Sequence, residues 1–287
     1  MKAILLPTAL LGLAACTPVD GPRSAQNGQG SSQATINQRA QRPVAVATTQ
    51  STLTAAQKST IGRKIWQNES GGTRNGLTAW NDGEAFPSLG IGHFIWYPAG
   101  KSGPYTESFP QFIAFARQQG ANPPAIALSR GAPWPTQIAF KSEFNGRAMT
   151  ELRNWLAAHI ALQTDFIIAK SRASLPKILQ AAGSDAARVR ANYNRTATSA
   201  SGQYGLIDYV NFKGEGINTK ERYNGQGWGL LQVLQQMRGT ATGQAAAVEF
   251  SNAAKAVMAR RVANSGGKDV RWNAGWQNRC ATYAQPL

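Results

Sequence analysis

The chain has 287 residues, 42% of them hydrophobic and 15% charged, and its two cysteines and two histidines exclude a disulfide framework and a zinc motif. With 30 basic and 14 acidic side chains, the formal net charge of +16 calls for an anionic partner. Because the Lys and Arg residues are scattered and form no basic helix or RNA-binding motif, the charge does not point to nucleic acid as that partner.

The first fifteen residues have the pattern of an export signal. The apolar stretch of residues 4–13 is about ten residues long, too short for a membrane span of roughly 20. Leu13-Ala14-Ala15-Cys16 then forms a small-residue box that resembles a bacterial lipoprotein signal. The resemblance implies a lipid on Cys16 and export to a membrane, facing the periplasm from the outer membrane in a Gram-negative cell. The alternative is an ordinary signal peptide in which Cys16 is incidental.

Residues 16–50 form the next segment, rich in Pro, Gly, Ser, Gln, Asn and Thr. Such a segment cannot bury enough apolar surface to offset the entropy lost on ordering, so we predict a disordered tether. A flexible chain of this length has a typical end-to-end distance of roughly 30–35 Å. We expect the remaining domain, residues 51–287, to act on a polymer beside the membrane.

The first elements of this domain are a helix and a small sheet. Ala56, Ile61 and Ile65 are spaced as on one face of an amphipathic helix, which should end near Glu69 because Gly71-Gly72 follows. Residues 73–100 combine many Gly, Asn, Asp and Pro residues with short apolar runs. This pattern predicts a small antiparallel hairpin sheet.

Periodicity predicts mostly helix after residue 105. A Pro-rich irregular stretch, residues 122–135, is expected to connect two lobes. The expected helices are one near 109–119 ended by Gly120, one carrying the stripe Met149, Leu152, Leu156 and Ile160, and others near 162–182, 185–197, 228–238 and 243–264. The predicted fold class is α+β, mostly helical, with a small sheet-containing lobe joined to a larger helical lobe.

Two acidic residues are candidates for acid-assisted cleavage of a glycosidic bond. Glu69 should lie at the C-terminal end of the first helix, where the negative end of the helix dipole disfavours its ionisation. Asp82 lies in the following turn, and Ser88 stands six residues further on. Glu84 is the alternative second carboxylate, although we expect it to face solvent. Taken alone, Glu69 would more readily be explained as a solvent-exposed residue at a helix end.

Residues 69–93 resemble the active-site region of phage-type lysozymes. In that family a catalytic Glu is followed by an Asp, by a hydroxyl residue six positions later, and by a Gly-x-Gly-His turn. The matching residues here are Glu69, Leu77, Trp80, Asp82, Ser88, Gly90, Gly92 and His93. The match covers about 25 residues. It departs from the family in a wider interval between Glu69 and Asp82 and in a Ser where Thr is commoner.

The resemblance implies a lysozyme-like fold and a muramidase that needs no metal or cofactor. Glu69 would protonate the glycosidic oxygen between N-acetylmuramic acid and N-acetylglucosamine. Asp82 would stabilise positive charge on the sugar ring and, with Ser88, hold the attacking water, which implies inversion at the anomeric carbon. Gly90, Gly92 and His93 would support the site, and we expect the protein to act as a monomer.

A second patch, residues 204–216 and 222–229, places Tyr, Asn, Gln and Trp among glycines. Aromatic rings can stack on sugar faces and amides can bind hydroxyl groups, so Asn211, Tyr223 and Gln226 are the expected substrate contacts. The alternative is a Gly-rich loop between helices whose aromatic residues belong to the core.

Other readings stay open. A lytic transglycosylase uses one Glu and expels water, whereas Asp82 with Ser88 favours hydrolysis. A non-catalytic wall-binding lipoprotein and a basic binder of nucleic acid or lipopolysaccharide are the rivals of other classes. Cys280 is expected to be a buried thiol without a redox role, and His159 a packed histidine. Whether the wall is the cell's own or a competitor's stays open.

Overall fold

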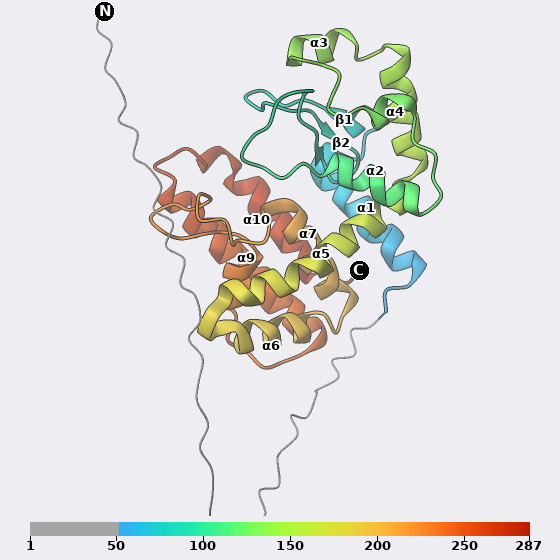
Figure 1. Cartoon of the computed structure of the whole chain (residues 1–287). Helices are drawn as coiled ribbons and strands as arrows, with labels where there is room; N and C mark the ends of the chain where they lie inside the picture. Colours follow the sequence, from blue (N-terminus) through green and yellow to red (C-terminus); the bar gives the residue numbers. More distant parts are fainter. Residues whose placement is uncertain (1–51) are drawn as a thin grey trace, which may run out of the picture. The chain divides into compact units, whose positions relative to one another are not determined.

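The computed structural model describes residues 52–287, which fall within one compact unit and are mostly helical (Figure 1). The predicted signal peptide, Cys16 and the predicted tether lie outside the described residues. The α-helices of the described part are α1 (Ala55–Ser70), α2 (Phe109–Gln118), α3 (Gln137–Ser142), α4 (Arg147–Ala158), α5 (Ile160–Ala182), α6 (Ala186–Thr196), α7 (Ala200–Lys213), α8 (Leu230–Gln236), α9 (Gly243–Asn264) and α10 (Asn273–Ala281). Within residues 52–287, no helix has both the length and the apolar character to cross a membrane.

Helix α1 forms where the sequence predicts it because both of its ends carry strong local signals. The Thr54 hydroxyl accepts a hydrogen bond from the Gln57 amide, and the Gln57 side chain accepts one from the Thr54 amide. Such a capping box stabilises a helix by about 1 kcal/mol. Ile61 and Ile65 are buried, and Gly71 ends the helix with a left-handed φ of 63°.

A three-stranded antiparallel sheet follows, as predicted. Strands β1 (Thr78–Ala79), β2 (Ser88–Leu89) and β3 (Phe94–Ile95) pair in the order β1-β2-β3, with Thr78 opposite Leu89 and Ser88 opposite Ile95. The strands are short, and aromatic packing supports them: the Phe94 ring stacks on Phe112 of α2 with centroids 5.1 Å apart. The coarse prediction of an α+β fold with a small sheet is confirmed.

Helix α5 joins two groups of elements. The sheet, α2, α3 and α4 gather at one end of the described unit, whereas α6 to α10 form the other end (Figure 1). With 23 residues α5 is about 35 Å long, and it packs against α1, α2, α6 and α7. The expectation that residues 122–135 connect the two parts is wrong. That stretch lies between α2 and α3, contains a short 3₁₀ turn (Ala125–Leu128), and packs on α2 and α4.

Helix α7 rules out the alternative of a glycine-rich loop for residues 204–213, whereas Gly214 and Gly216 follow the helix with positive φ values of 75° and 80°. Most of α7 is buried, and its glycines lie against neighbouring residues, Gly202 against the Thr196 backbone and Gly205 against Phe250 and Tyr283. A Cβ added at Gly205 would meet Phe250 at 3.0 Å and Tyr283 at 3.3 Å. These glycines therefore permit close packing rather than a turn. The packing offsets the destabilisation of about 1 kcal/mol that each glycine causes inside a helix.

The other expected helices are confirmed, and two more appear. The stripe residues Met149, Leu152 and Leu156 lie on α4. This helix ends before His159, so Ile160 begins α5 instead. Sequence periodicity did not indicate α3 or α10, because both are short and neither has a regular apolar stripe.

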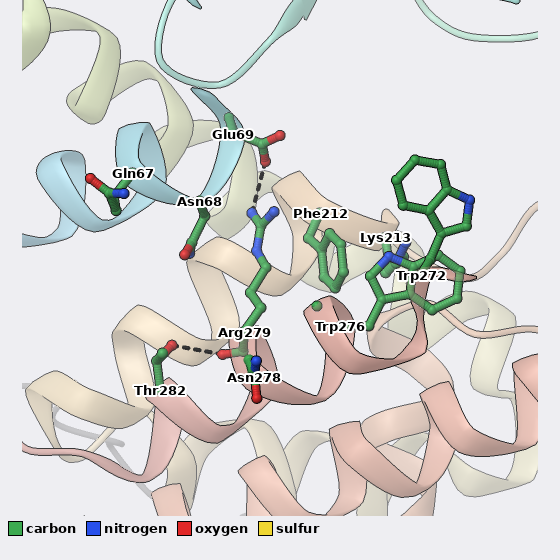
Figure 2. Close-up of a pocket in the computed structure, with 11 residues that line it drawn as sticks. Gln67, Asn68, Glu69, Phe212, Lys213, Trp272, Trp276, Asn278, Arg279 and Thr282 are labelled. Atoms are coloured by element: carbon green, nitrogen blue, oxygen red, sulfur yellow. Dashed lines mark hydrogen bonds and ion pairs between the residues drawn. The ribbon is translucent and has the colours of Figure 1, made fainter. Parts of the chain in front are cut away.

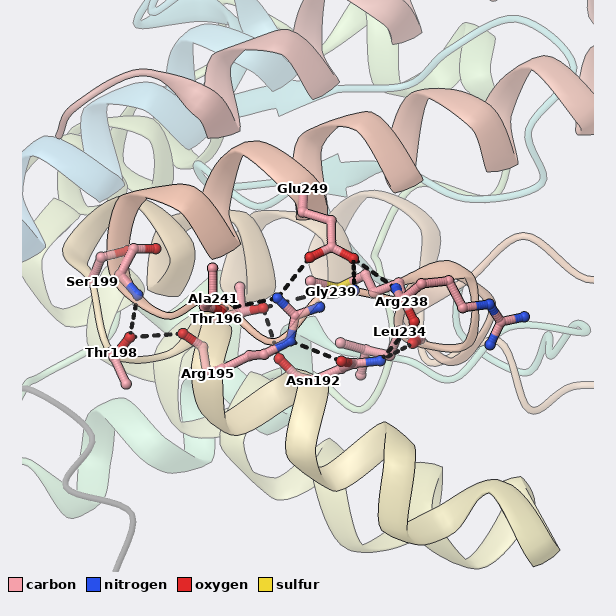
Figure 3. Close-up of polar contacts among 12 residues, drawn as sticks. Asn192, Arg195, Thr196, Thr198, Ser199, Leu234, Arg238, Gly239, Ala241 and Glu249 are labelled. Atoms are coloured by element: carbon pink, nitrogen blue, oxygen red, sulfur yellow. Dashed lines mark hydrogen bonds and ion pairs between the residues drawn. The ribbon is translucent and has the colours of Figure 1, made fainter.

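A polar cluster holds the segment between α8 and α9 (Figure 3). Glu249 of α9 pairs with Arg195 of α6 at 2.7 Å and accepts hydrogen bonds from the backbone amides of Arg238 and Gly239 at 2.7 and 2.8 Å. Asn192 donates to the Leu234 carbonyl at 2.8 Å. All of these bonds join elements to one another, so we assign the cluster a structural role.

Candidate active site

Glu69 lies in the last turn of α1, with its side chain directed away from solvent. Its Oε1 accepts hydrogen bonds from Nη2 of Arg279 at 2.7 Å and from Nδ2 of Asn211 at 3.1 Å. Its Oε2 lies 3.8 Å from Nδ1 of His93, and the side chain is only 16% exposed. Oε1 therefore has two hydrogen-bond donors, whereas Oε2 has none among the described residues and faces His93.

Arg279 is held by a second carboxylate beneath Glu69. Asp208 of α7 is fully buried and accepts hydrogen bonds from Nε and Nη2 of Arg279, both at 2.8 Å, and from the Tyr283 hydroxyl at 2.6 Å. Burial would lower the pKa of Arg279, but the carboxylates of Asp208 and Glu69 raise it well above its usual value. The guanidinium therefore stays charged and ties α1, α7 and α10 together at the end of α1.

Neither Arg279 nor Asp208 was among the residues predicted from sequence. Asp208 did carry a signal, because it interrupts the apolar stretch of residues 204–210, and a buried carboxylate requires a cationic partner. That signal does not say which of the 30 basic residues is the partner. Arg279 follows Glu69 by 210 positions, so only the packing of α10 against the rest identifies it.

The turn of residues 90–93 is held to α4 and α5 by hydrogen bonds of Gln163. Gly90 has a left-handed φ of 73°. The fully buried side chain of Gln163 accepts a hydrogen bond from the Ile91 amide at 2.9 Å and donates to the Leu156 carbonyl at 2.7 Å. A Cβ at Gly92 would meet Oδ1 of Asn211 at 3.0 Å, so a glycine here lets Asn211 approach Glu69.

His93 ends this turn with a φ of 47°, a conformation that is costly for a residue with a side chain. Its Nδ1 faces the carboxylate of Glu69. The carboxylate beside this histidine is therefore that of the candidate acid itself.

Replacing Gly90 with Ala is expected to reduce the free energy of unfolding by about 1–3 kcal/mol. The substitution strains the left-handed backbone and also drives a methyl group into the Gln163 side chain. Gly100→Ala is the matched control, because Gly100 has a φ of 76° but nothing within 4 Å of the added Cβ. Urea unfolding should show the larger loss for Gly90→Ala, and equal losses would contradict a fastening role for Gln163.

The Asp82 carboxylate points away from the other candidates. Its side chain is 91% exposed, and its Oδ1 accepts hydrogen bonds from Gln137 at 2.9 Å and Lys141 at 3.4 Å, which lower the pKa of Asp82. Among the interactions of the described residues, Asp82 has none with Glu69, Ser88 or His93. The structure does not join Asp82 to the Glu69 cluster.

Glu84, two residues after Asp82, is the other acidic side chain of this segment. The expectation that Glu84 faces solvent is wrong, because its side chain is half-buried. Its Oε2 accepts a hydrogen bond from Nδ2 of Asn81 at 3.2 Å. Burial raises the pKa of Glu84, while Asn81, His93 and the Ser88 hydroxyl oppose this shift. Ser88 itself is buried on β2.

The three predicted substrate contacts separate in the structure. Asn211 reaches Glu69, as described above. Tyr223 and Gln226 instead pair with each other through backbone hydrogen bonds of 3.1 and 2.9 Å in a tight turn. The Tyr223 ring lies on Trp228 with centroids 4.8 Å apart, and Gln226 is exposed. Neither of these two residues contacts Glu69.

A cavity of about 570 Å³ opens beside Glu69, between the ends of α1 and α7 and one face of α10 (Figure 2). Its wall includes the indoles of Trp272 and Trp276, the Phe212 ring and the amine of Lys213. Within residues 52–287, no three His, Cys, Asp or Glu side chains gather as a metal site requires.

The remaining reactive side chains are packed into the structure. Cys280 is buried, as predicted, and burial raises the pKa of its thiol to about 12. His159 stacks on Trp155 at 4.5 Å, and its Nδ1 lies 2.7 Å from the Trp155 carbonyl oxygen. Both contacts agree with structural roles.

No protein-family model matches the chain, and no significant match to it was found among curated proteins or solved structures.

Proposed function

We propose that the chain is a muramidase of lysozyme-like fold, which hydrolyses the bond between N-acetylmuramic acid and N-acetylglucosamine in peptidoglycan. The observation that carries this function is a short segment with two partly buried carboxylates in different environments. Oε1 of Glu69 is bound by Arg279 and Asn211 while Oε2 faces His93, and Glu84 is half-buried with a raised pKa. Glycoside hydrolysis requires two carboxyl groups, one to protonate the leaving oxygen and one to assist the attacking water.

In this mechanism Glu69 is the general acid. Its Oε2 donates a proton to the glycosidic oxygen as the bond to the anomeric carbon breaks. Positive charge then develops on the sugar ring. A water attacks the anomeric carbon and transfers its proton to the second carboxylate, which leaves a free hydroxyl at the new reducing end.

Glu84 is the second carboxylate in this mechanism, in place of the Asp82 expected from the family pattern. It is half-buried, and the Ser88 hydroxyl is among the groups that lower its pKa, whereas Asp82 is engaged by Gln137 and Lys141 at an exposed position.

A lytic transglycosylase is the second candidate. The exposed position of Asp82 favours it, because the argument for hydrolysis from Asp82 and Ser88 no longer holds. In that reaction the sugar's own hydroxyl attacks the anomeric carbon, and the product carries a 1,6-anhydro end instead of a hydroxyl.

Digestion of purified peptidoglycan by the full-length protein tests both candidates. Mass spectrometry of the released muropeptides should find hydrated reducing ends. Anhydro ends, lighter by one water, would instead assign the chain to the transglycosylases. An absence of products across pH and salt would leave a wall-binding lipoprotein as the better account.

Export, a lipid on Cys16 and a tether over residues 16–50 concern residues outside the described part and stay predictions. Anchored by a lipid on Cys16 and carried by this tether, the enzyme would work on wall material close to its membrane. The net charge of +16 supports an anionic polymer as the partner.

A further inference from the structure

We infer that the cavity beside Glu69 is a subsite for a sugar residue that bears a carboxylate, with Trp272 and Trp276 as stacking surfaces and Lys213 as the counter-ion. The identification of that sugar as N-acetylmuramic acid rests on the proposed function. The subsite itself rests on three features of the cavity wall, which are its indoles, its unpaired amine and its free amides.

The indoles supply an apolar surface beside the cavity. Trp272 ends a short 3₁₀ helix (Val270–Trp272) and is 51% exposed, and the neighbouring Val270 is exposed as well. Trp276 follows one turn of α10 later and packs on Phe212, with centroids 6.4 Å apart. In Figure 2 both indoles lie around the Lys213 side chain. Flat aromatic faces at the rim of a cavity suit the apolar face of a pyranose ring.

Lys213 supplies the charge. Its Nζ lies 3.8 Å from the centre of the Trp276 ring and 3.9 Å from that of Phe212. No carboxylate of residues 52–287 forms an ion pair with it. An amine held among aromatic rings without a counter-ion has lost much of its hydration, so a ligand carboxylate would be bound strongly.

The charged groups around Lys213 explain why a ligand must provide its counter-ion. Burial, with Arg261 of α9 and Arg279 of α10, lowers the pKa of Lys213 to about 7, while Glu69 of α1 and Asp269 oppose the shift. Glu69 and Asp269 are already paired with Arg279 and Arg261, respectively. Arg279 itself is committed to Asp208 and Glu69, which leaves Lys213 as the cation of the cavity wall that can receive an anion.

Amide groups complete the subsite. Asn278 and Gln67 line the cavity, and neither makes a side-chain hydrogen bond within the described residues. Their amides can bind hydroxyl or acetamido groups of a sugar. Because Glu69 forms part of the same wall, a sugar held here lies directly beside the candidate acid.

Binding of two disaccharides to the full-length protein tests the subsite by calorimetry. The acidic probe is N-acetylglucosaminyl-N-acetylmuramic acid, which contains no bond that a muramidase cuts, and the neutral probe is di-N-acetylchitobiose. At about pH 6, below the Lys213 pKa of about 7, the acidic probe should bind about tenfold more tightly. At about pH 8.5 the amine is mostly neutral, and the preference should largely disappear.

Three variants test which side chains cause the preference for the acidic probe. Lys213→Met should abolish the preference but keep affinity for the neutral probe, whereas Lys268→Met removes an exposed charge outside the cavity and should change neither. Trp272→Ala should weaken the binding of both probes. Equal affinity of the wild type for both sugars, or an unchanged preference in Lys213→Met, would overturn the subsite even if the wall is cleaved. A preference that depends on Lys213, without wall cleavage, would uphold the subsite and reject the muramidase.

Discussion

Glu69→Gln should cleave peptidoglycan about a hundred to ten thousand times more slowly than the wild type, because the amide has no acidic proton to give to the leaving oxygen. The amide oxygen of Gln can still accept the hydrogen bonds that Oε1 receives from Arg279 and Asn211. The fold should therefore persist. The rate of muropeptide release at saturating substrate measures the loss, and an unchanged melting temperature shows that the protein is intact.

The neighbouring acidic residues provide the matched comparison. Glu84→Gln should cause a loss of similar size if Glu84 takes the proton of the attacking water. Asp82→Asn removes an exposed carboxylate and should change the rate by no more than about twofold. A large loss in Asp82→Asn with near-normal activity in Glu84→Gln would return the second role to Asp82.

The pH profile of the wild type should reflect Glu84 as well. Burial raises the pKa of Glu84 above its ordinary value of 4.5, and a general base must be ionised to act. Activity should therefore fall as the pH drops through this raised pKa, at a higher pH than an exposed glutamate would give. In Glu84→Gln the residual activity should no longer fall as the pH drops through this range.

Arg279→Met is expected to have the largest effect on stability, with a loss of about 3–5 kcal/mol in the free energy of unfolding. The substitution leaves Asp208 fully buried with its negative charge, and only Tyr283 and Asn68 remain as donors to that carboxylate. A loss of this size is a large part of the stability of a typical domain. Urea unfolding, followed by circular dichroism, measures it.

Two controls separate the buried charge from other effects of Arg279→Met. Adding Asp208→Asn to Arg279→Met removes the unpaired charge and should recover part of the lost stability, because a neutral amide costs less to bury. Arg271→Met removes an exposed charge from the same region of the chain and should change stability by no more than about 0.5 kcal/mol. A loss in Arg279→Met no larger than that in Arg271→Met would contradict the role of the ion-pair network.

Arg279→Met should also lower activity beyond its effect on stability. Without the guanidinium, Oε1 of Glu69 keeps only the hydrogen bond from Asn211, and the carboxylate can rotate. The loss should appear in the rate of cleavage measured well below the melting temperature, and adding Glu69→Gln should lower the rate much further, because Glu69 is still the proton donor in Arg279→Met.

The local elements of the fold could be predicted from the sequence because their signals lie within a few residues of one another. The apolar positions Ile61 and Ile65 and the Gly71-Gly72 pair predict α1, and the structure adds the cap at Thr54. Short apolar runs between turn residues indicated the sheet. The spacing of Gly90, Gly92 and His93 indicated a tight turn, and the structure has left-handed backbone at Gly90 and His93.

Hydrophobic periodicity does not identify a helix that is buried on nearly all sides. Helix α7 is covered on nearly all sides, so its sequence lacks the alternation of apolar and polar faces from which a helix is recognised. Its glycines then resembled those of a loop, and only the contacts of Gly205 with Phe250 and Tyr283 explain them.

The sequence by itself determined that Glu69 ends a helix and is followed by acidic residues and a glycine-rich turn. Only the tertiary structure decided that Glu84 rather than Asp82 is half-buried, that Arg279 and Asp208 hold Glu69, and that Lys213 lines a cavity with two tryptophans. The physical reason is the range of the interactions. Capping and turns depend on neighbours in the chain, whereas the pairing of a buried charge depends on which distant helices pack together.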